Sequence, residues 1–152
     1  MALYYDTVDP DAANSLMSYY DEWAGLPEGT LQSVARIESS YNPETGRFVN
    51  GCNRVQACGL MQIRPIALKD IYNRYRINID PTDPTQAIVG AACMFNLNRR
   101  YIRYYTKREP DIFALVAAYN GGWTAGRKYM YRQRLSNETR NYLAKFDMYG
   151  VA

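Results

Sequence analysis

The chain has 152 residues, enough for one ordinary domain, and its 47% hydrophobic and 22% charged residues are typical of a globular protein. It contains no histidine, which excludes Ser-His and Cys-His nucleophiles and the common histidine-containing zinc hydrolase sites. Three scattered cysteines form no metal-ligand pattern, and a net charge of +3 is small for a nucleic-acid partner, so metal, cofactor and nucleic acid are not expected. Acid–base chemistry must come from carboxylates, Tyr, Lys or Cys.

Helical patterns cover nearly the whole chain, so the sequence predicts a mainly α fold with at most a small β element. After an irregular arm, the predicted helices span residues 11–24, 27–38, 65–75, 84–105, 111–119, 124–132 and 137–146. The second is expected to begin near Pro27 because Pro and an acidic residue favour a first helical turn. Turn-forming residues predict a long loop over residues 40–56, with a short two-stranded ribbon near Arg47 to Val49.

The sequence carries few signals of cellular compartment. The spacing of Cys52 and Cys58 allows them to pair, whereas Cys93 lies in an apolar helical stretch and is expected to be a core thiol. No apolar span approaches the length of a transmembrane helix, so none is expected. The first residues lack a basic region followed by an apolar run, so no secretory signal peptide is expected.

Basic residues gather from Arg99 onward among many tyrosines. Those that follow include Arg103, Lys107, Arg108, Arg127, Lys128, Arg132 and Arg134. One interpretation is ordinary solvated helix faces with the Tyr side chains packed beneath them. The other is a surface that is attracted to an anionic cell-wall polymer or membrane.

One acidic residue lies on a helix face that is predicted to pack inward. Glu38 follows Leu31 by seven residues and Val34 by four, so the three share one face of the helix. Because burying an unpaired charge is costly, the Glu38 carboxyl group is expected to keep its proton, with a raised pKa. A protonated carboxylic acid is suited to general acid catalysis. The alternative is that Glu38 ends the helix and accepts hydrogen bonds from the next loop.

Three later motifs carry groups that suit sugar binding. They are Gly59-Leu60-Met61-Gln62-Ile63, Ala118-Tyr119-Asn120-Gly121-Gly122 and Glu138-Thr139-Arg140-Asn141-Tyr142. The Gln62 amide both donates and accepts hydrogen bonds, and Tyr119 with Asn120 offers a ring and an amide. Glu138 and Tyr142 lie four apart on one helix face. Each motif also has a structural interpretation, as a core turn, a helix end or a helix-face pair.

Taken in order, these motifs and Glu38-Ser39-Ser40-Tyr41-Asn42-Pro43 resemble the soluble lytic transglycosylases. Any one motif is weak, but four in order at this spacing are specific. The resemblance implies a goose-type-lysozyme-like fold. It also implies that residues 1–24 form an N-terminal arm and first helix, residues 25–146 the catalytic domain, and residues 147–152 a C-terminal tail.

The resemblance assigns a role to single residues as well. Glu38 matches the family's catalytic glutamate, and Ser39 matches the serine that usually follows it. Gln62 matches a groove residue that contacts substrate. The other substrate-binding candidates line the cleavage site or lie on the late helix that closes the groove: Tyr119, Asn120, Glu138 and Tyr142.

The family's reaction needs only one carboxylate, whereas many glycosidases need two. The N-acetyl group of the MurNAc sugar supplies the nucleophile. Glu38 would first protonate the leaving GlcNAc oxygen and then take the proton of the MurNAc C6 hydroxyl as it attacks C1. The product is a 1,6-anhydroMurNAc end, and the implied partner is the peptidoglycan glycan strand.

Departures from the family pattern leave fine substrate preference open. Arg64 replaces a usual Met, Cys58 a small residue, and Trp123 a frequent Pro. Two alternatives also remain open. One is a hydrolytic lysozyme on the same fold, and the other is a non-catalytic virion structural protein that retains the groove.

The expected location follows from the substrate, which lies outside the cytoplasm, and from the missing signal peptide. We expect a protein carried in a bacteriophage virion, with other virion or ejection proteins as partners. It would act in the periplasm or cell wall of the host during genome entry. A domain of a secretion system is the alternative.

Overall fold

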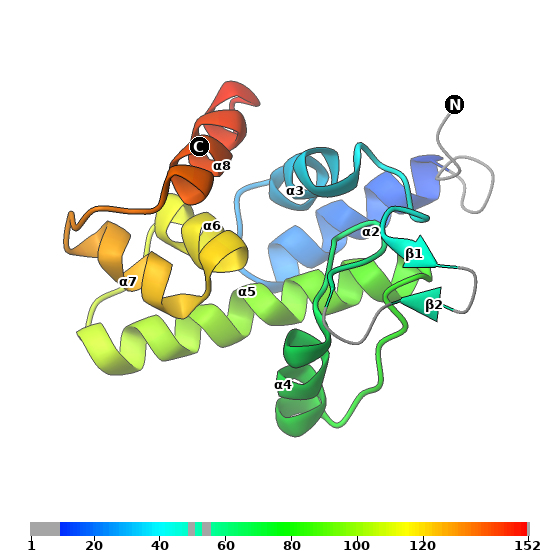
Figure 1. Cartoon of the computed structure of the whole chain (residues 1–152), viewed down its shortest axis with the longest axis horizontal. Helices are drawn as coiled ribbons and strands as arrows, with labels where there is room; N and C mark the ends of the chain where they lie inside the picture. Colours follow the sequence, from blue (N-terminus) through cyan, green and yellow to red (C-terminus); the bar gives the residue numbers. More distant parts are fainter. Residues whose placement is uncertain (1–9, 49–50, 53–55, 152) are drawn as a thin grey trace. The chain divides into compact units, whose positions relative to one another are not determined.

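The computed structural model describes residues 10–48, 51–52 and 56–151, and nearly all of its regular structure is α-helical, as the sequence predicts (Figure 1). The elements are α2 (Pro10–Trp23), α3 (Thr30–Ser39), β1 (Arg47–Phe48), β2 (Gly51–Cys52), α4 (Pro65–Tyr75), α5 (Pro84–Thr106), α6 (Ile112–Gly121), α7 (Trp123–Met130) and α8 (Asn137–Met148). The chain divides into two compact units, Met1–Cys93 and Met94–Ala152, with the boundary inside α5. Each unit is described by itself.

In the first unit, α2 packs against α3, and an acidic side chain joins them. Asp21 continues the buried stripe of α2 that includes Met17, and its carboxylate accepts hydrogen bonds from the backbone N–H groups of Gly29, at 2.9 Å, and Leu31, at 3.0 Å. These are donors that the first turn of a helix leaves unpaired. The prediction that α3 begins near Pro27 is wrong. Gly29 has a φ of 93°, which is not a right-handed helical conformation, so the helix begins only after it, at Thr30.

The remaining elements of the first unit agree with the predicted ones. Helix α4 has the predicted bounds, with Pro65 at its first turn. The antiparallel ribbon pairs Phe48 with Gly51, so the small β element is confirmed. Cys58 is in a disulfide bond, and Cys93 is a free, buried thiol whose pKa burial raises to about 11.

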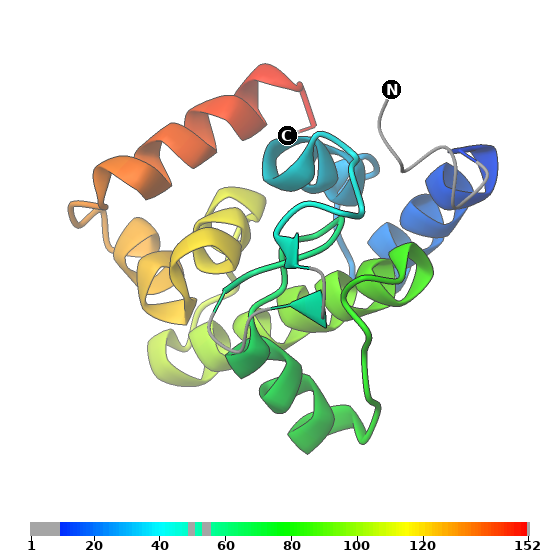
Figure 2. The same cartoon turned by 45° about the vertical axis from the view of Figure 1, so that its right-hand side comes forward.

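In the second unit, α6 packs against both α7 and α8, as the turned view of Figure 2 shows. Helix α6 is almost wholly apolar and begins where the Asp111 carboxylate accepts from the N–H of Ala114, at 2.9 Å. Helix α7 approaches it closely at Gly126, where a Cβ atom would lie 2.8 Å from the Ala114 carbonyl oxygen. The Ser136 hydroxyl caps α8.

Three tyrosines at the end of α5 are at the surface. The side chains of Tyr101, Tyr104 and Tyr105 are 42%, 66% and 56% exposed. The interpretation in which tyrosines pack beneath solvated basic residues is therefore wrong for the end of α5. Within the part of the chain that the structure describes, no helix combines the length and apolar character needed to cross a bilayer.

Candidate active site

Glu38 lies one residue before the end of α3 and is half-buried. Leu31 and Val34, on the same helix face, are fully buried. The prediction that this face packs inward is therefore correct for the apolar residues, while Glu38 itself is only partly buried. A group in that position can meet a substrate without opening the core.

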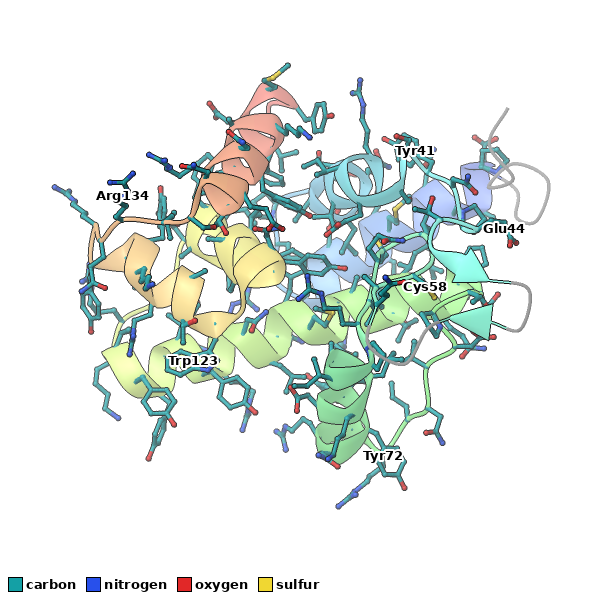
Figure 3. The ribbon with its side chains drawn as sticks, viewed as in Figure 1. Tyr41, Glu44, Cys58, Tyr72, Trp123 and Arg134 are labelled. Atoms are coloured by element: carbon teal, nitrogen blue, oxygen red, sulfur yellow. The ribbon has the colours of Figure 1, made fainter. Side chains whose placement is uncertain are left out.

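The chain reverses sharply just after Glu38. Ser40 and Tyr41 both have positive φ, 52° and 63°, and their N–H groups bond back to the carbonyl oxygens of Arg36 and Ala35. The left-handed conformation costs a non-glycine residue about 1–2 kcal/mol, so its surroundings must hold it in place. Figure 3 labels Tyr41 and Glu44 on the loop that results. The helix end that carries Glu38 is thus tightly defined.

Ser39 connects that helix end to the motif that begins at Gly59. Its buried hydroxyl oxygen lies 2.7 Å from the carbonyl oxygen of Leu60 and 3.1 Å from that of Ala35. A hydroxyl has one proton, so it donates to one of these acceptors at a time. The structure therefore gives Ser39, predicted as a substrate-binding residue, a positioning contact.

The motif itself is a rigid turn. The backbone of Cys58 pairs with that of Ile63, and Gln62, at φ 50°, donates from its amide nitrogen to the carbonyl oxygens of Thr45 and Gly59, both at 2.9 Å. Gly59 has a φ of 85°, and a Cβ atom there would lie only 1.8 Å from the carbonyl oxygen of Pro81. The absence of a side chain at Gly59 therefore permits this close approach. The amide nitrogen of Gln62 therefore stabilises the turn.

In the second unit, Asn120 holds the end of α6 to the start of α8. Its amide nitrogen donates to the Glu138 carboxylate at 3.3 Å, and its amide oxygen accepts from the Thr139 hydroxyl at 2.8 Å. Thr139 is buried, and Ser136 Oγ lies 3.1 Å from its hydroxyl oxygen. The structure thus brings together Asn120 and Glu138, which the sequence predicts as site residues from separate motifs.

The two aromatic candidates are largely buried. The Tyr119 ring stacks on Phe95, with centroids 5.0 Å apart and an interplanar angle of 21°. Tyr142 is 6% exposed. The predicted residues therefore divide between the units, with Glu38, Ser39 and Gln62 in the first and Tyr119, Asn120, Glu138 and Tyr142 in the second.

Sequence reasoning missed Asp21 and did not single out Thr139. Burial raises the pKa of Asp21 to about 6, against the opposing effect of the N–H groups of Leu31 and Gly29. A signal was present, because Asp21 follows Met17 by four residues on the buried stripe of α2. Among the described residues, no group of three or more Cys, Asp or Glu side chains could hold a metal ion.

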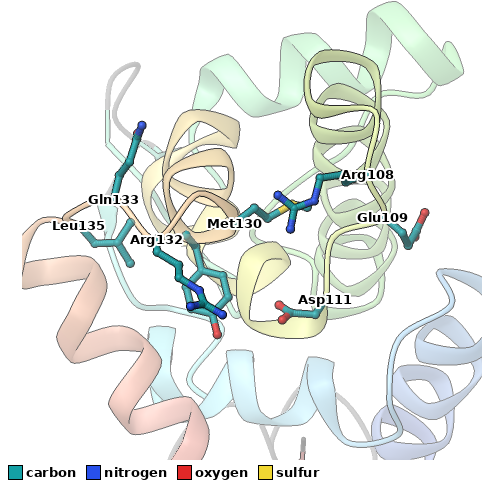
Figure 4. Close-up of a pocket in the computed structure, with 8 residues that line it drawn as sticks. Arg108, Glu109, Asp111, Met130, Arg132, Gln133 and Leu135 are labelled. Atoms are coloured by element: carbon teal, nitrogen blue, oxygen red, sulfur yellow. The ribbon is translucent and has the colours of Figure 1, made fainter.

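The second unit also contains a polar cavity of about 460 Å³, shown in Figure 4, which includes none of the predicted site residues. It is lined by Arg108, Glu109, Asp111, Tyr129, Met130, Arg132, Gln133 and Leu135. Burial and the nearby Asp111 carboxylate raise the pKa of Tyr129. The cavity thus lies between the segment after α5 and the end of α7 with the segment that follows it.

Comparisons with known proteins agree with the resemblance seen in the sequence. Membrane-bound lytic murein transglycosylase C of Haemophilus influenzae (strain PittEE) is 27% identical, over 81% of this chain and 41% of its own length. The protein of that name from Photorhabdus laumondii is 30% identical, over 64% of this chain and 28% of its own length. The chain thus spans less than half the length of these relatives.

A solved structure of an inactive glutamate-to-glutamine mutant of the lytic transglycosylase Slt from Pseudomonas aeruginosa has the same fold. It covers 93% of this chain and 24% of its own chain, with a TM-score of 0.64 and 21% identity. The predicted fold class is therefore confirmed. The family described as the transglycosylase SLT domain matches residues 15–142. This chain belongs to the transglycosylase SLT domain family.

Proposed function

We propose that this chain cleaves the MurNAc-β-1,4-GlcNAc bond of peptidoglycan by the lytic transglycosylase reaction, leaving a 1,6-anhydroMurNAc end. The observation that carries the proposal is the family match over residues 15–142, with Glu38 half-buried near the end of α3. The relatives are named lytic murein transglycosylases, and the glutamate-to-glutamine mutant of the structural neighbour is inactive.

Glu38 would act twice in this reaction. As an acid, its carboxyl group gives a proton to the leaving GlcNAc oxygen while the C1–O4 bond breaks and the N-acetyl group of MurNAc closes onto C1. As a base, the resulting carboxylate takes the proton of the C6 hydroxyl, whose oxygen bonds to C1 and displaces the acetamido oxygen. The proton given in the first step is recovered in the second, and no water is consumed.

Other acids of the first unit are less suited to this role. Asp21 is 1% exposed, and its carboxylate oxygens accept hydrogen bonds from Gly29 and Leu31 at the start of α3. Glu44 lies on the loop after the reversed chain. Ser39 and the turn that contains Gln62 would keep the end of α3 in position while Glu38 exchanges its proton.

Glu38→Gln tests the proposal, with Glu44→Gln as its matched control. Both substitutions replace a carboxyl group with an amide of nearly the same size. On isolated peptidoglycan, Glu38→Gln should lower turnover about 10²–10⁴-fold, because it removes the general acid and base, whereas Glu44→Gln should keep the activity. Equal activity of Glu38→Gln and the unchanged chain would sink the assignment.

Mass spectrometry of the digestion products separates the two enzymatic alternatives. Lytic cleavage gives anhydro ends that are lighter by one water than the reducing ends left by a hydrolytic lysozyme. Reducing ends alone would show that water, and not the C6 hydroxyl, attacks C1. If neither product is found, the structural-protein alternative is favoured.

The route to the cell wall stays a prediction. A bacteriophage particle that carries the protein and releases it at genome entry would bring it to peptidoglycan from outside the host. Mass spectrometry of purified virions should then detect its peptides alongside the other virion proteins. Their absence from virions would favour delivery by a secretion system.

A further inference from the structure

The second unit concentrates the positive charge of the chain. Residues 99–134 contain nine basic and two acidic residues, a net charge of +7, so the rest of the chain carries −4 to give the total of +3. The basic residues are Arg99, Arg100, Arg103, Lys107, Arg108, Arg127, Lys128, Arg132 and Arg134. A field of this strength in one segment points to an anionic partner.

The two acidic residues of this segment are already engaged. The Glu109 carboxylate pairs with Arg103, at 2.5 Å, and with Arg99, at 3.5 Å. Asp111 caps α6 by accepting from the N–H of Ala114. Neither acid therefore offsets the seven other cations toward an approaching anion.

Four exposed tyrosines and the half-buried Trp123 lie among these cations. We call this surface the aromatic–cationic face, and it consists of Tyr101, Tyr104, Tyr105, Lys107, Arg108, Trp123, Arg127 and Tyr131. Trp123, labelled in Figure 3, stacks on Tyr105 with centroids 4.6 Å apart, and Tyr101 lies 6.5 Å from it. The face joins the end of α5 to α7 within one unit.

Several of these rings contact a cation or another ring. The Arg127 guanidinium lies 5.3 Å from the Trp123 centroid, and Lys107 Nζ lies 4.6 Å from the Tyr104 centroid. The exposed tyrosines still offer ring surface and phenol hydroxyls to a partner, beside the positive charge.

We propose that the aromatic–cationic face binds the surface of an anionic phospholipid bilayer. Tyr and Trp have an apolar body and a polar end, which suits the boundary between headgroups and acyl chains. Lys and Arg are attracted to the negative headgroups of the same surface. A nucleic-acid phosphate backbone would use the cations but leave the exposed tyrosines without a role. The proposal concerns none of the proposed catalytic and substrate-binding residues and does not depend on turnover.

Vesicle flotation tests this proposal with the full chain. The protein should float with vesicles of phosphatidylcholine mixed with phosphatidylglycerol, and much less with phosphatidylcholine alone. Each cation near such a surface contributes roughly fivefold to binding, so the triple variant Lys107→Gln/Arg108→Gln/Arg127→Gln should bind about a hundredfold more weakly.

The matched control removes three exposed cations from α4 and the residue that ends it, Lys69→Gln/Arg74→Gln/Arg76→Gln. It changes the net charge equally, and it also removes a cation–ring pair, because Arg76 lies 5.6 Å from the centroid of the exposed Tyr72. Vesicle binding should be kept in this control. Equal loss in both triple variants would mean that net charge alone attracts the chain, which would overturn the proposal.

Trp123 gives a second measurement that does not require any cation to be changed. In a Trp23→Phe background, Trp123 fluorescence should shift to shorter wavelength when phosphatidylglycerol vesicles are added, and salt should reverse the shift. No shift would contradict insertion of this face into the headgroup region. If the Lys107, Arg108 and Arg127 substitutions weakened binding to isolated peptidoglycan or DNA instead of vesicles, the partner would be that polymer. Circular dichroism of each variant confirms that it is folded.

Discussion

The two units hold their predicted site residues in different ways. In the first, the residues around Glu38 are fixed by the backbone: positive φ angles at Ser40, Tyr41 and Gln62, and carbonyl oxygens that accept from Ser39 and Gln62. In the second, side chains bond to side chains, as when Asn120 contacts the start of α8. A substitution that disturbs the backbone conformation in the first unit should therefore lower stability strongly. A substitution in the side-chain network of the second unit should lower it less.

The largest expected effect is at Gly59. In Gly59→Ala, overpacking against the Pro81 carbonyl oxygen adds about 1–3 kcal/mol to a left-handed strain of about 1–2 kcal/mol, so the free energy of unfolding should fall by about 2–5 kcal/mol. Thermal unfolding measures the loss. The control is Gly150→Ala, where φ is also positive but no atom lies within 4 Å of the added Cβ. Equal losses would show that close approach at Gly59 is unimportant.

A smaller effect concerns the pH dependence of stability through Asp21. Its folded pKa of about 6 exceeds the ordinary value of 3.8, so the folded state holds the proton more tightly than the unfolded state. The stability from this group is fully present below pH 3.8 and is lost as pH rises through about 6. The shift of the Asp21 pKa sets an upper limit of about 3 kcal/mol on its contribution to the free energy of unfolding, and solvent screening reduces that contribution.

Asp21→Asn isolates that contribution. The substitution removes the titrating group but leaves one acceptor for the N–H groups of Gly29 and Leu31. Thermal melts over the same pH range should therefore show a smaller decline in Tm for the variant than for the unchanged chain. Parallel declines in the two proteins would mean that Asp21 does not titrate in this window.

The smallest effect is expected in the second unit. Thr139→Val keeps the side-chain shape but removes the hydroxyl that donates to Asn120, so the loss should be about 1 kcal/mol, or roughly 2–4 °C in Tm. Thr124→Val, at an exposed position of α7, is the control and should change Tm less. A loss at Thr139 as large as that of Gly59→Ala would erase the contrast between the units.

Local signals predicted the elements well, and long-range contacts explain the errors. Helix α4 has its predicted bounds because Pro65 favours a helix start in its own chain segment. The predicted start of α3 was wrong because the carboxylate that caps this helix belongs to Asp21, ten residues before Leu31. The residues near Pro27 carry no pattern that indicates a capping group so far away in the sequence.

The candidate site shows the same division. Spacing predicted that Glu38 shares a helix face with Leu31, and the structure places it half-buried near the C-terminal end of α3. The contact of Gln62 was not predictable, because its acceptors are backbone oxygens, one of them on Thr45, far from it in sequence. Side-chain identity says what a residue can donate, while the fold decides which acceptor it meets.

The capping of α3 by Asp21 has a consequence for how the domain can be cut. A fragment that begins at Gly25 would keep every proposed catalytic and substrate-binding residue and still lose the carboxylate that binds the N–H groups of Gly29 and Leu31. Helix α3, which carries Glu38, would then begin with unpaired backbone N–H groups, and the apolar residues that pack against α2 would be exposed. The smallest fragment that keeps the start of α3 capped therefore has to include α2, and a fusion partner should not replace that helix.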